Sequence, residues 1–566
     1  MSALASTPRQ SPSLVAALGP AVMLSWGWRR CAIALVSGAV GALAMPPFGF
    51  VPALAVSMIA AVWLIDGSSQ HSERAGAFAA SLLSAFGVGW WWGFGYFLAA
   101  LWWLGAAFLV DAAQFAWALP LGVIALPAAL ALYPAIGFML ARAVWPHGAA
   151  RPLALAFGLG LAEWLRAVLF TGFPWDEFGL AFGEHLWLAQ GAALFGLHGL
   201  TLLVIAILAA PATLWDGRGW RRWAPTGVAL VALAGLAAYG QQRLTEPPPA
   251  AVAGVKLRVL QTNLSQGADF TPEKGAEILG RYLALSGRPA PGRAGDAGVA
   301  GVIGDANVTG DASVTGVTHL IWPESAFPFL LAREPGALAR IAEFLQGGAV
   351  LATGAARVDM PAAGRPARYY NSILTLNRAG LLPVRYDKRH LVPFGEFLPF
   401  RAFWDKLGVT QFVHIPGGFS PGRGSNLLPL PGAPEALAEV CYEAIFPNEE
   451  GGARAGAAER AGWILNVTDD AWFGLTPGPY QHFAQARLRA IEWGLPLARA
   501  ANGGISAIFD AYGRIVASGE LGSESIVDGV LPGALPPTPE SRWGSLTFAL
   551  GLALALGVSL STRVLF

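Results

Sequence analysis

Long apolar runs fill most of the first 241 residues and return once near the end of the chain. A helix needs about 20 mainly apolar residues to cross a lipid bilayer, and several runs approach or exceed that length. They lie at residues 31–46, 49–66, 76–104, 117–144, 153–170, 189–214, 224–241 and 544–562. The composition agrees, because 54% of the residues are hydrophobic and only 13% are charged. We therefore expect a multi-span α-helical membrane protein with about eight spans.

The basic residues predict how these spans are oriented. Lys and Arg concentrate in the short loops that stay in the cytoplasm. Arginines precede the first run and follow every second run thereafter, at Arg29, Arg30, Arg74, Arg142, Arg151, Arg218, Arg221, Arg222 and Arg563. This pattern indicates a cytoplasmic N-terminus, and no cleavage-site pattern follows the first run, so we expect a retained anchor. Seven spans then place the block at 245–540 on the side opposite the cytoplasm.

The block at 245–540 has a different pattern from the membrane domain at 1–244 and the last span at 541–566. Strand-like runs lie at 256–264, 318–325, 348–356, 371–377, 435–443, 462–468 and 505–510, and candidate helices at 272–285, 336–346 and 480–494. Alternation of this kind indicates a layered α/β domain. Residues 288–316 contain no aromatic residue and are rich in Gly, Ala, Val, Asp and Thr, which is typical of a flexible surface insertion.

Charge and metal-ligand residues exclude several functions. The formal net charge is +1, so no basic surface for nucleic acid is expected. The only two cysteines are Cys31, within an apolar run, and Cys441, within the α/β block, and a disulfide between them is not expected. The eight histidines have no metal-ligand spacing. We predict neither a metal nor a cofactor.

Three reactive side chains of the α/β block each follow a strand-like run. They are Glu324, Lys388 and Cys441. A thiolate attacks carbonyl carbon, a nearby carboxylate can accept the thiol proton, and an ammonium can stabilise the oxyanion that forms. Each residue alone has a simpler interpretation: Cys441 as a packing residue, Glu324 as a polar strand end, and Lys388 as part of a solvated charged run. The ordered set favours acyl chemistry.

The sequence around these residues contains several long motifs in order. They are TGFPW at 171–175, WPES at 322–325, YDKRHLVPFGEFLPF at 386–400, VCYEAIFP at 440–447, DDAWFG at 469–474, GPYQH at 478–482 and RAIEWGLPLARAANGGIS at 489–506. Residues 255–530 resemble the nitrilase superfamily, which implies an α-β-β-α sandwich. Together with the flanking spans, the chain resembles the membrane-embedded branch, the apolipoprotein N-acyltransferases.

The resemblance implies roles for the residues that match its motifs. Cys441 corresponds to the nucleophile, Glu324 to the general base and Lys388 to the oxyanion stabiliser. Supporting positions are Glu396, Tyr442 and Glu443, and the predicted substrate contacts are Phe270, Trp322 and Trp472, whereas Arg389 and His390 are interpreted as structural.

The chain departs from the family pattern at two of its residues. Phe270 stands where the family often has Trp, and Asp469 stands where it often has Asn. Phe can still fill an apolar lipid pocket. Asp469 is expected to add a negative charge near the site, which puts the local hydrogen bonding implied by the family in doubt.

The resemblance also implies a reaction and its partners. An acyl chain from a phospholipid, phosphatidylethanolamine by expectation, forms a thioester on Cys441. It then passes to the α-amino group of a diacylglyceryl-cysteine at the N-terminus of an apolipoprotein. The expected location is the bacterial inner membrane, with the catalytic domain on the periplasmic side and the protein a monomer. Two alternatives are a membrane-tethered amidase with the same triad, and a transporter or receptor whose α/β block only binds lipid or peptide.

Overall fold

The computed structural model describes residues 14–68, 76–216, 219–267, 270–288, 316–360, 367–401, 406, 417–447 and 461–564. Every predicted apolar run coincides with a helix. These helices are α2 Gly27–Gly41, α3 Val51–Asp66, α4 Ala77–Leu101, α8 Leu132–Ala143, α9 Arg151–Val168, α12 Ala192–Ala209, α13 Ala224–Thr245 and α19 Ser545–Val564. Residues 289–315, almost the whole predicted insertion, lie outside the described residues.

Helix length separates these spans into two groups. Within the described ranges, six helical segments are long and apolar enough to cross a membrane. They are Ala77–Val110, Ala112–Ala143, Gly148–Thr171, Ala192–Trp215, Trp220–Thr245 and Ser545–Arg563. Helices α2 and α3 have only 15 and 16 residues, which is shorter than a full crossing requires. The predicted number of spans is therefore approximately confirmed.

The membrane helices pack in a chain of neighbours. Helix α2 lies against α4, α4 against α8, α8 against α9, and α9 against α12, while α19 contacts both α9 and α12. Small residues allow the closest of these contacts. A Cβ atom on Gly38 would lie 1.9 Å from the carbonyl oxygen of Trp92, and one on Gly95 would lie 2.0 Å from that of Leu35. Helices α2 and α4 can therefore approach closely only with glycine at these positions.

The second part of the chain forms two six-stranded sheets that pack face to face. The first sheet has the order β12-β1-β2-β3-β4-β5 and the second β11-β10-β9-β8-β7-β6. Strands β1, β2 and β3 are parallel, as are β7, β8 and β9. The strands of the first sheet are β1 Lys256–Gln261, β2 His319–Trp322, β3 Val350–Asp359, β4 Arg368–Asn377, β5 Gly380–Asp387 and β12 Ser525–Val530. Those of the second are β6 Leu427–Leu428, β7 Ala436–Val440, β8 Trp463–Asp469, β9 Leu497–Asn502, β10 Ala507–Phe509 and β11 Ile515–Ser518.

Helices cover the outer face of each sheet. Helices α14 Gly275–Gly287 and α15 Pro335–Phe344 pack on the first sheet, and α17 Pro477–Trp493 packs on the second. A third apolar cluster, which includes Ile321 and Val440, fills the space between the sheets. The predicted α-β-β-α sandwich is confirmed.

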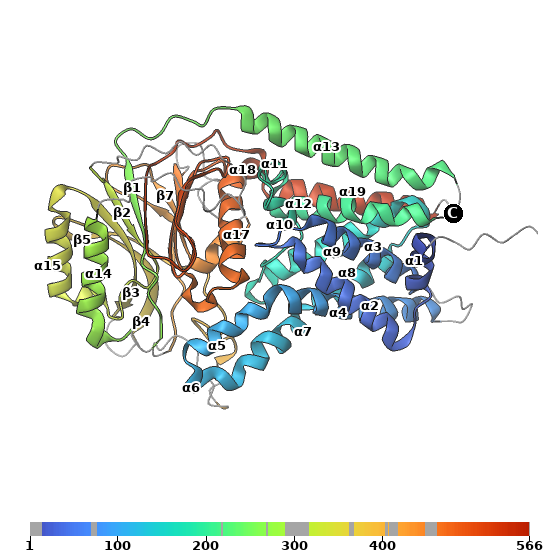
Figure 1. The fold of residues 1–566 in the computed structure, drawn as a ribbon, viewed down its shortest axis with the longest axis horizontal. Coiled ribbons are helices and arrows are strands. Elements are labelled where there is room, and N and C mark those ends of the chain that lie inside the picture. Colours follow the sequence, from blue (N-terminus) through green and yellow to red (C-terminus); the bar gives the residue numbers. More distant parts are fainter. Residues whose placement is uncertain are drawn as a thin grey trace, which may run out of the picture.

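Helix α17 lies between the sandwich and the membrane bundle. Figure 1 shows α14 and α15 on the far side of the sheets, and α17 between the sheets and the membrane helices. It contacts α12 of the bundle, and its residues Leu488 and Ile491 belong to the same apolar cluster as the membrane helices. The α17 layer of the sandwich and the membrane helices therefore share one apolar core.

Candidate active site

Cys441 occupies a sharp turn between a strand and a short helix. Strand β7 ends at Val440, and the 3₁₀ helix Cys441–Ile445 follows at once. Cys441 has φ of 51°, a left-handed conformation that costs a non-glycine residue about 1–2 kcal/mol. Hydrogen bonds fix the backbone on both sides of it. The Val440 N–H donates to Glu443 Oε2 at 2.7 Å, and the Cys441 carbonyl oxygen lies 3.0 Å from His482 Nε2.

Glu324 and Lys388 approach this turn from the other sheet. Glu324 follows β2, where its carboxylate accepts hydrogen bonds from the Asn371 amide at 2.7 Å and the Asp469 backbone N–H at 2.8 Å. Lys388 follows β5, and its Nζ lies 3.6 Å from Glu324 Oε1. Both side chains are buried, and both charges act on the Cys441 thiol. The structure therefore brings together the three residues predicted as a triad.

The predicted supporting residues fix this arrangement. Glu396 Oε1 lies 3.0 Å from Lys388 Nζ and also accepts from the Asn371 amide, at 2.8 Å. Glu443 Oε1 accepts from the Tyr386 hydroxyl at 2.8 Å and from the backbone N–H of Arg389 at 2.8 Å. Because its Oε2 accepts from the Val440 backbone N–H, Glu443 connects the loop after Lys388 to the turn at Cys441.

Burial controls the protonation of the triad. Burial raises the pKa of the Cys441 thiol well above its usual range, and the neighbouring Glu324 raises it further against Lys388. Burial also raises the pKa of Glu324, although Lys388 opposes this shift. Burial alone would lower the pKa of Lys388, but the carboxylates of Glu396 and Glu324 raise it. The resting site therefore holds a neutral thiol beside a lysine cation, and attack by the thiol requires a base.

Asp469 differs from the sequence-based expectation. It ends β8, and its Oδ1 accepts from the Ala471 backbone N–H and the Asn502 amide, each at 3.1 Å. Burial and the nearby Glu324 raise the pKa of Asp469 well above its usual range, which favours the neutral acid. The burial of Asp469 thus opposes the expected negative charge, which stays a prediction. A neutral carboxylic acid has nearly the shape and polarity of asparagine.

A second polar cluster lies beside Cys441 and was not predicted. His482, on α17, has Nδ1 2.8 Å from Asp470 Oδ1, and Asp470 Oδ2 accepts from Arg499 at 2.7 Å. Thr468 donates to Asp470 at 2.9 Å. Both ring nitrogens of His482 face acceptors, the Asp470 carboxylate and the Cys441 carbonyl oxygen, and burial lowers the pKa of the ring. A neutral ring donates to one of these acceptors at a time. In the sequence, His482, Asp470 and Arg499 lie in the motifs GPYQH, DDAWFG and RAIEWGLPLARAANGGIS, and Thr468 ends the strand-like run at 462–468.

Three ligand atoms in this region are close enough to surround a metal ion. The relevant atoms of Cys441, Asp470 and His482 lie within 4.8 Å of one another. However, Asp470 is already bound by Arg499, Thr468 and His482, and a guanidinium at the same carboxylate opposes a cation. The residues therefore fit a hydrogen-bonded support for Cys441 better than a metal centre.

The three predicted substrate contacts lie in different surroundings. Trp322 is fully buried between Tyr282 and Phe327 and donates to the Ser286 hydroxyl at 3.0 Å. Phe270 packs against the same cluster, under α14 and α15. Trp472 is half-buried in the 3₁₀ helix Asp470–Phe473. Trp322 is thus a core residue, Phe270 is partly buried against the same cluster, and Trp472 follows β8 in the short helix after Asp469.

A loop of the membrane domain reaches the turn at Cys441. In this loop, Thr171–Trp175, the Gly172 carbonyl accepts from the Tyr442 hydroxyl at 2.7 Å. Gly172 has φ of 78°, and a Cβ atom there would lie 2.1 Å from the Ala167 carbonyl oxygen, so only glycine fits. The Thr171 carbonyl contacts His390 Nε2. The membrane domain therefore contacts Tyr442, the residue after Cys441.

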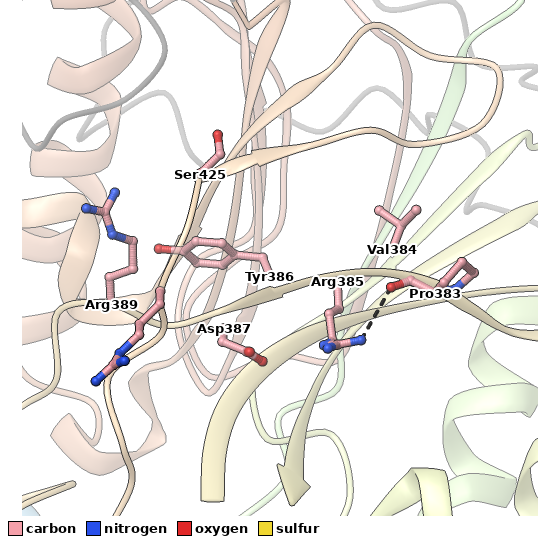
Figure 2. A pocket seen from close by; sticks show the side chains of 8 residues that line it. Pro383, Val384, Arg385, Tyr386, Asp387, Arg389 and Ser425 are labelled. Atoms are coloured by element: carbon pink, nitrogen blue, oxygen red, sulfur yellow. Dashed lines mark hydrogen bonds between the residues drawn. The ribbon is translucent and has the colours of Figure 1, made fainter. Parts of the chain in front are cut away.

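A surface hollow lies outside this centre. Its volume is 310 Å³, and its lining includes Arg385, Arg389 and Arg423 along the open edge of the sandwich. Figure 2 shows Arg385 beside Pro383, whose carbonyl it approaches at 3.5 Å. Asp387 in the lining is paired with Arg357 at 2.7 Å. The three triad residues are not part of this lining.

The chain is similar to known proteins over nearly its full length. Residues 37–210 match the family described as apolipoprotein N-acyltransferase N-terminal domain, and residues 311–532 match carbon-nitrogen hydrolase. Apolipoprotein N-acyltransferase from Rhodopseudomonas palustris is 47% identical, covering 94% of this chain and 95% of the relative. The protein of that name from Bradyrhizobium diazoefficiens is 47% identical, covering 96% and 97%. That from Allorhizobium ampelinum is 41% identical, covering 97% and 98%.

Proposed function

Because the chain belongs to the apolipoprotein N-acyltransferase family, we propose that Cys441 carries an acyl chain from a phospholipid to the α-amino group of an apolipoprotein. The protein is an acyltransferase of lipoprotein maturation, and it is a membrane protein. The similarity includes the membrane helices as well as the sandwich. It therefore does not favour a tethered amidase or a transporter.

The first half-reaction forms a thioester. The Cys441 sulfur attacks the ester carbonyl carbon of the phospholipid while Glu324 accepts the thiol proton. Lys388 and the backbone N–H of Tyr442 stabilise the oxyanion. As the tetrahedral intermediate collapses, the bond between carbonyl carbon and alkoxy oxygen breaks. The leaving oxygen takes the proton from Glu324, and lysophospholipid departs.

The second half-reaction returns the thiol. The α-amine of a diacylglyceryl-cysteine attacks the thioester carbonyl and loses a proton to Glu324. The carbon–sulfur bond breaks, and Glu324 returns the proton to the sulfur. The products are an amide and free Cys441, so one base serves both steps.

The observation that carries this mechanism is the half-buried thiol next to a buried carboxylate. Because burial raises the pKa of Cys441, the sulfur is protonated at rest, and it needs a base such as Glu324. The turn also faces aromatic rings from the membrane side: Phe173 lies 6.4 Å from Tyr442 between ring centres. A dry site protects the thioester from water, as acyl transfer requires.

The proposal includes a location and partners. The arginine pattern and the position of α17 against the bundle support a bacterial inner-membrane protein whose domain at 245–540 is periplasmic. The acyl donor is a phospholipid such as phosphatidylethanolamine, and the acceptor is a diacylglyceryl apolipoprotein. A monomer contains every residue that the mechanism uses.

Mass spectrometry of the acyl-enzyme tests the proposal. Purified protein mixed with phospholipid should gain one acyl mass on the peptide that contains Cys441, and hydroxylamine should release it. Cys441→Ala should abolish the added mass. The matched control is Cys31→Ala, which removes the other cysteine of the chain and should leave acylation intact. Acyl mass that persists after Cys441→Ala would refute the nucleophile assignment.

A further inference from the structure

The side chain of Gln481 connects the catalytic helix α17 to the membrane bundle. Its Oε1 accepts from the indole N–H of Trp103 and from that of Trp175, each at 2.9 Å. Its Nε2 donates to the carbonyl oxygen of Ala100 at 3.2 Å and to that of Pro46 at 3.4 Å. All four partners belong to the membrane domain.

This arrangement satisfies the amide completely. Two donors face the oxygen and two acceptors face the nitrogen, so the orientation of the amide follows from its partners. Gln481 is 2% exposed. A buried polar group with every hydrogen bond made specifies one geometry strongly, because any shift leaves groups unpaired. The turn of α17 at Gln481 is therefore held by three separate membrane segments.

The next residue transmits this position to the nucleophile. The His482 ring packs against Trp175, with 5.2 Å between ring centres, and its Nε2 lies 3.0 Å from the Cys441 carbonyl oxygen. Cys441 has a left-handed backbone, which persists only when its surroundings enforce it. The contact with His482 connects that backbone to α17.

We propose that Gln481 is a positioning residue through which the membrane bundle sets the backbone of the nucleophile. The inference rests on Cys441 being the nucleophile of the proposed function. Gln481 touches no reacting atom. It fixes the turn of α17 whose next residue, His482, holds the Cys441 carbonyl.

Another glutamine on the same helix provides a matched control. Gln485 lies one turn further along α17 and is also fully buried. Its Nε2 donates only to the backbone carbonyl of Gln481, at 3.3 Å, and its Oε1 has no hydrogen-bond partner among the described residues. The two residues thus share helix, side chain and burial, and differ in their contact with the membrane domain.

The first experiment compares Gln481→Leu with Gln485→Leu in the full-length protein in phospholipid vesicles. Gln481→Leu should lower the rate constant of thioester formation about 10- to 100-fold, because small displacements of a nucleophile have effects of this size. The KM for phospholipid and the final amount of thioester per chain should not change. Gln485→Leu should leave all three quantities close to wild type.

The second experiment uses Gln481→Glu and the pH dependence of thioester formation. The neutral acid can accept from both indoles and donate to one carbonyl, whereas the carboxylate would oppose the carbonyl oxygens of Ala100 and Pro46. The rate relative to wild type at the same pH should therefore rise as pH falls. Gln485→Glu should show a flat ratio.

The outcomes separate this inference from the proposed function. Thioester that forms on Cys441→Ala protein would refute the proposed function. If Cys441→Ala protein forms no thioester but Gln481→Leu and Gln485→Leu react at equal rates, only the inferred role of Gln481 is refuted. A higher KM with an unchanged rate constant in Gln481→Leu would also overturn it. If Gln481→Leu does not fold, a flat pH ratio for Gln481→Glu would still refute the inference.

Discussion

Helices α15 and α17 cover opposite faces of the same sandwich, but their surroundings differ. In α15 only Ile341 is buried, and the polar side chains face outward. In α17, 15 of 17 residues are buried, including Arg487, Arg489 and Glu492. An amphipathic helix normally leaves its polar face in water. In α17 the membrane bundle covers that face instead.

The difference shows where the polar groups of α17 find partners. Glu492 accepts from the backbone N–H of Leu197 in α12 at 2.6 Å, and Arg487 donates to the Gly513 carbonyl at 2.7 Å. Buried polar groups require such partners. Helix α17 is therefore held in place by specific polar contacts, whereas α15 mainly closes an apolar core.

The largest expected effect tests whether the chemistry lies between the two helix layers rather than on the outer helix α15. Glu324→Gln should slow thioester formation about 10³-fold, because it removes the general base. The same substitution at Glu343, exposed on α15, should leave the rate unchanged. Both rates can be followed by acyl mass on the Cys441 peptide. A similar loss of rate in both proteins would contradict the placement of the chemistry at Glu324.

The next effect concerns stability. Arg499 is fully buried with Asp470, whereas Arg281 on α14 pairs with Glu524 at the surface. Arg499→Met leaves a buried carboxylate without its partner and should lower the free energy of unfolding by about 3–5 kcal/mol. Arg281→Met should cost about 0–1 kcal/mol. Denaturant unfolding in detergent measures both, and equal losses would contradict the distinction.

Acidification should lower the free energy of unfolding through the buried Asp470. Burial alone would raise the pKa of Asp470, but Arg499 and His482 lower it to about 2. Since this pKa lies below the usual value of about 3.9, the ionised Asp470 stabilises the folded protein fully above pH 4. That contribution to the free energy of unfolding is lost as pH falls toward 2. The loss is about 2.5 kcal/mol. Asp470→Asn should remove that part of the pH dependence of unfolding, and an unchanged slope would contradict the assignment.

The smallest effect is expected at Asp469. The neutral acid and an amide have similar shape and hydrogen bonding, so Asp469→Asn should change the rate of thioester formation by less than about twofold, an energy below about 0.4 kcal/mol. The pH profile should also keep its shape. A tenfold lower rate of thioester formation would mean that the Asp469 carboxyl takes part in proton transfer.

Much of this structure could be predicted from local sequence pattern. Hydropathy predicted the membrane helices, and alternating apolar residues predicted strands that overlap β1, β2, β3, β4, β7, β8 and β10. The positions of Glu324, Lys388 and Cys441 at strand ends were predicted too, and the roles assigned to them stay predictions. The helices and strands could be predicted because each depends on neighbouring residues.

Other features depend on distant residues and could not be predicted. Strand β9, LARAAN, lacks β-branched residues and contains Arg499, yet it is buried because Asn466 and Asp470 pair with that arginine. Gln481 meets Trp103 more than 300 positions away. The core position of Trp322, for which a substrate contact was predicted, follows from β2, where alternation turns Ile321 between the sheets and Trp322 toward α14.

The contact of α19 with α9 and α12 sets an order for biosynthesis. The ribosome makes α9 and α12 first, then the whole sandwich, and only then α19. Because domains emerge and fold from the N-terminal side, the sandwich leaves the ribosome while the surfaces of α9 and α12 that contact α19 are still uncovered. Insertion of this helix is therefore the step that completes the bundle, and a nascent chain stalled before it would hold all the catalytic residues on an unfinished membrane domain.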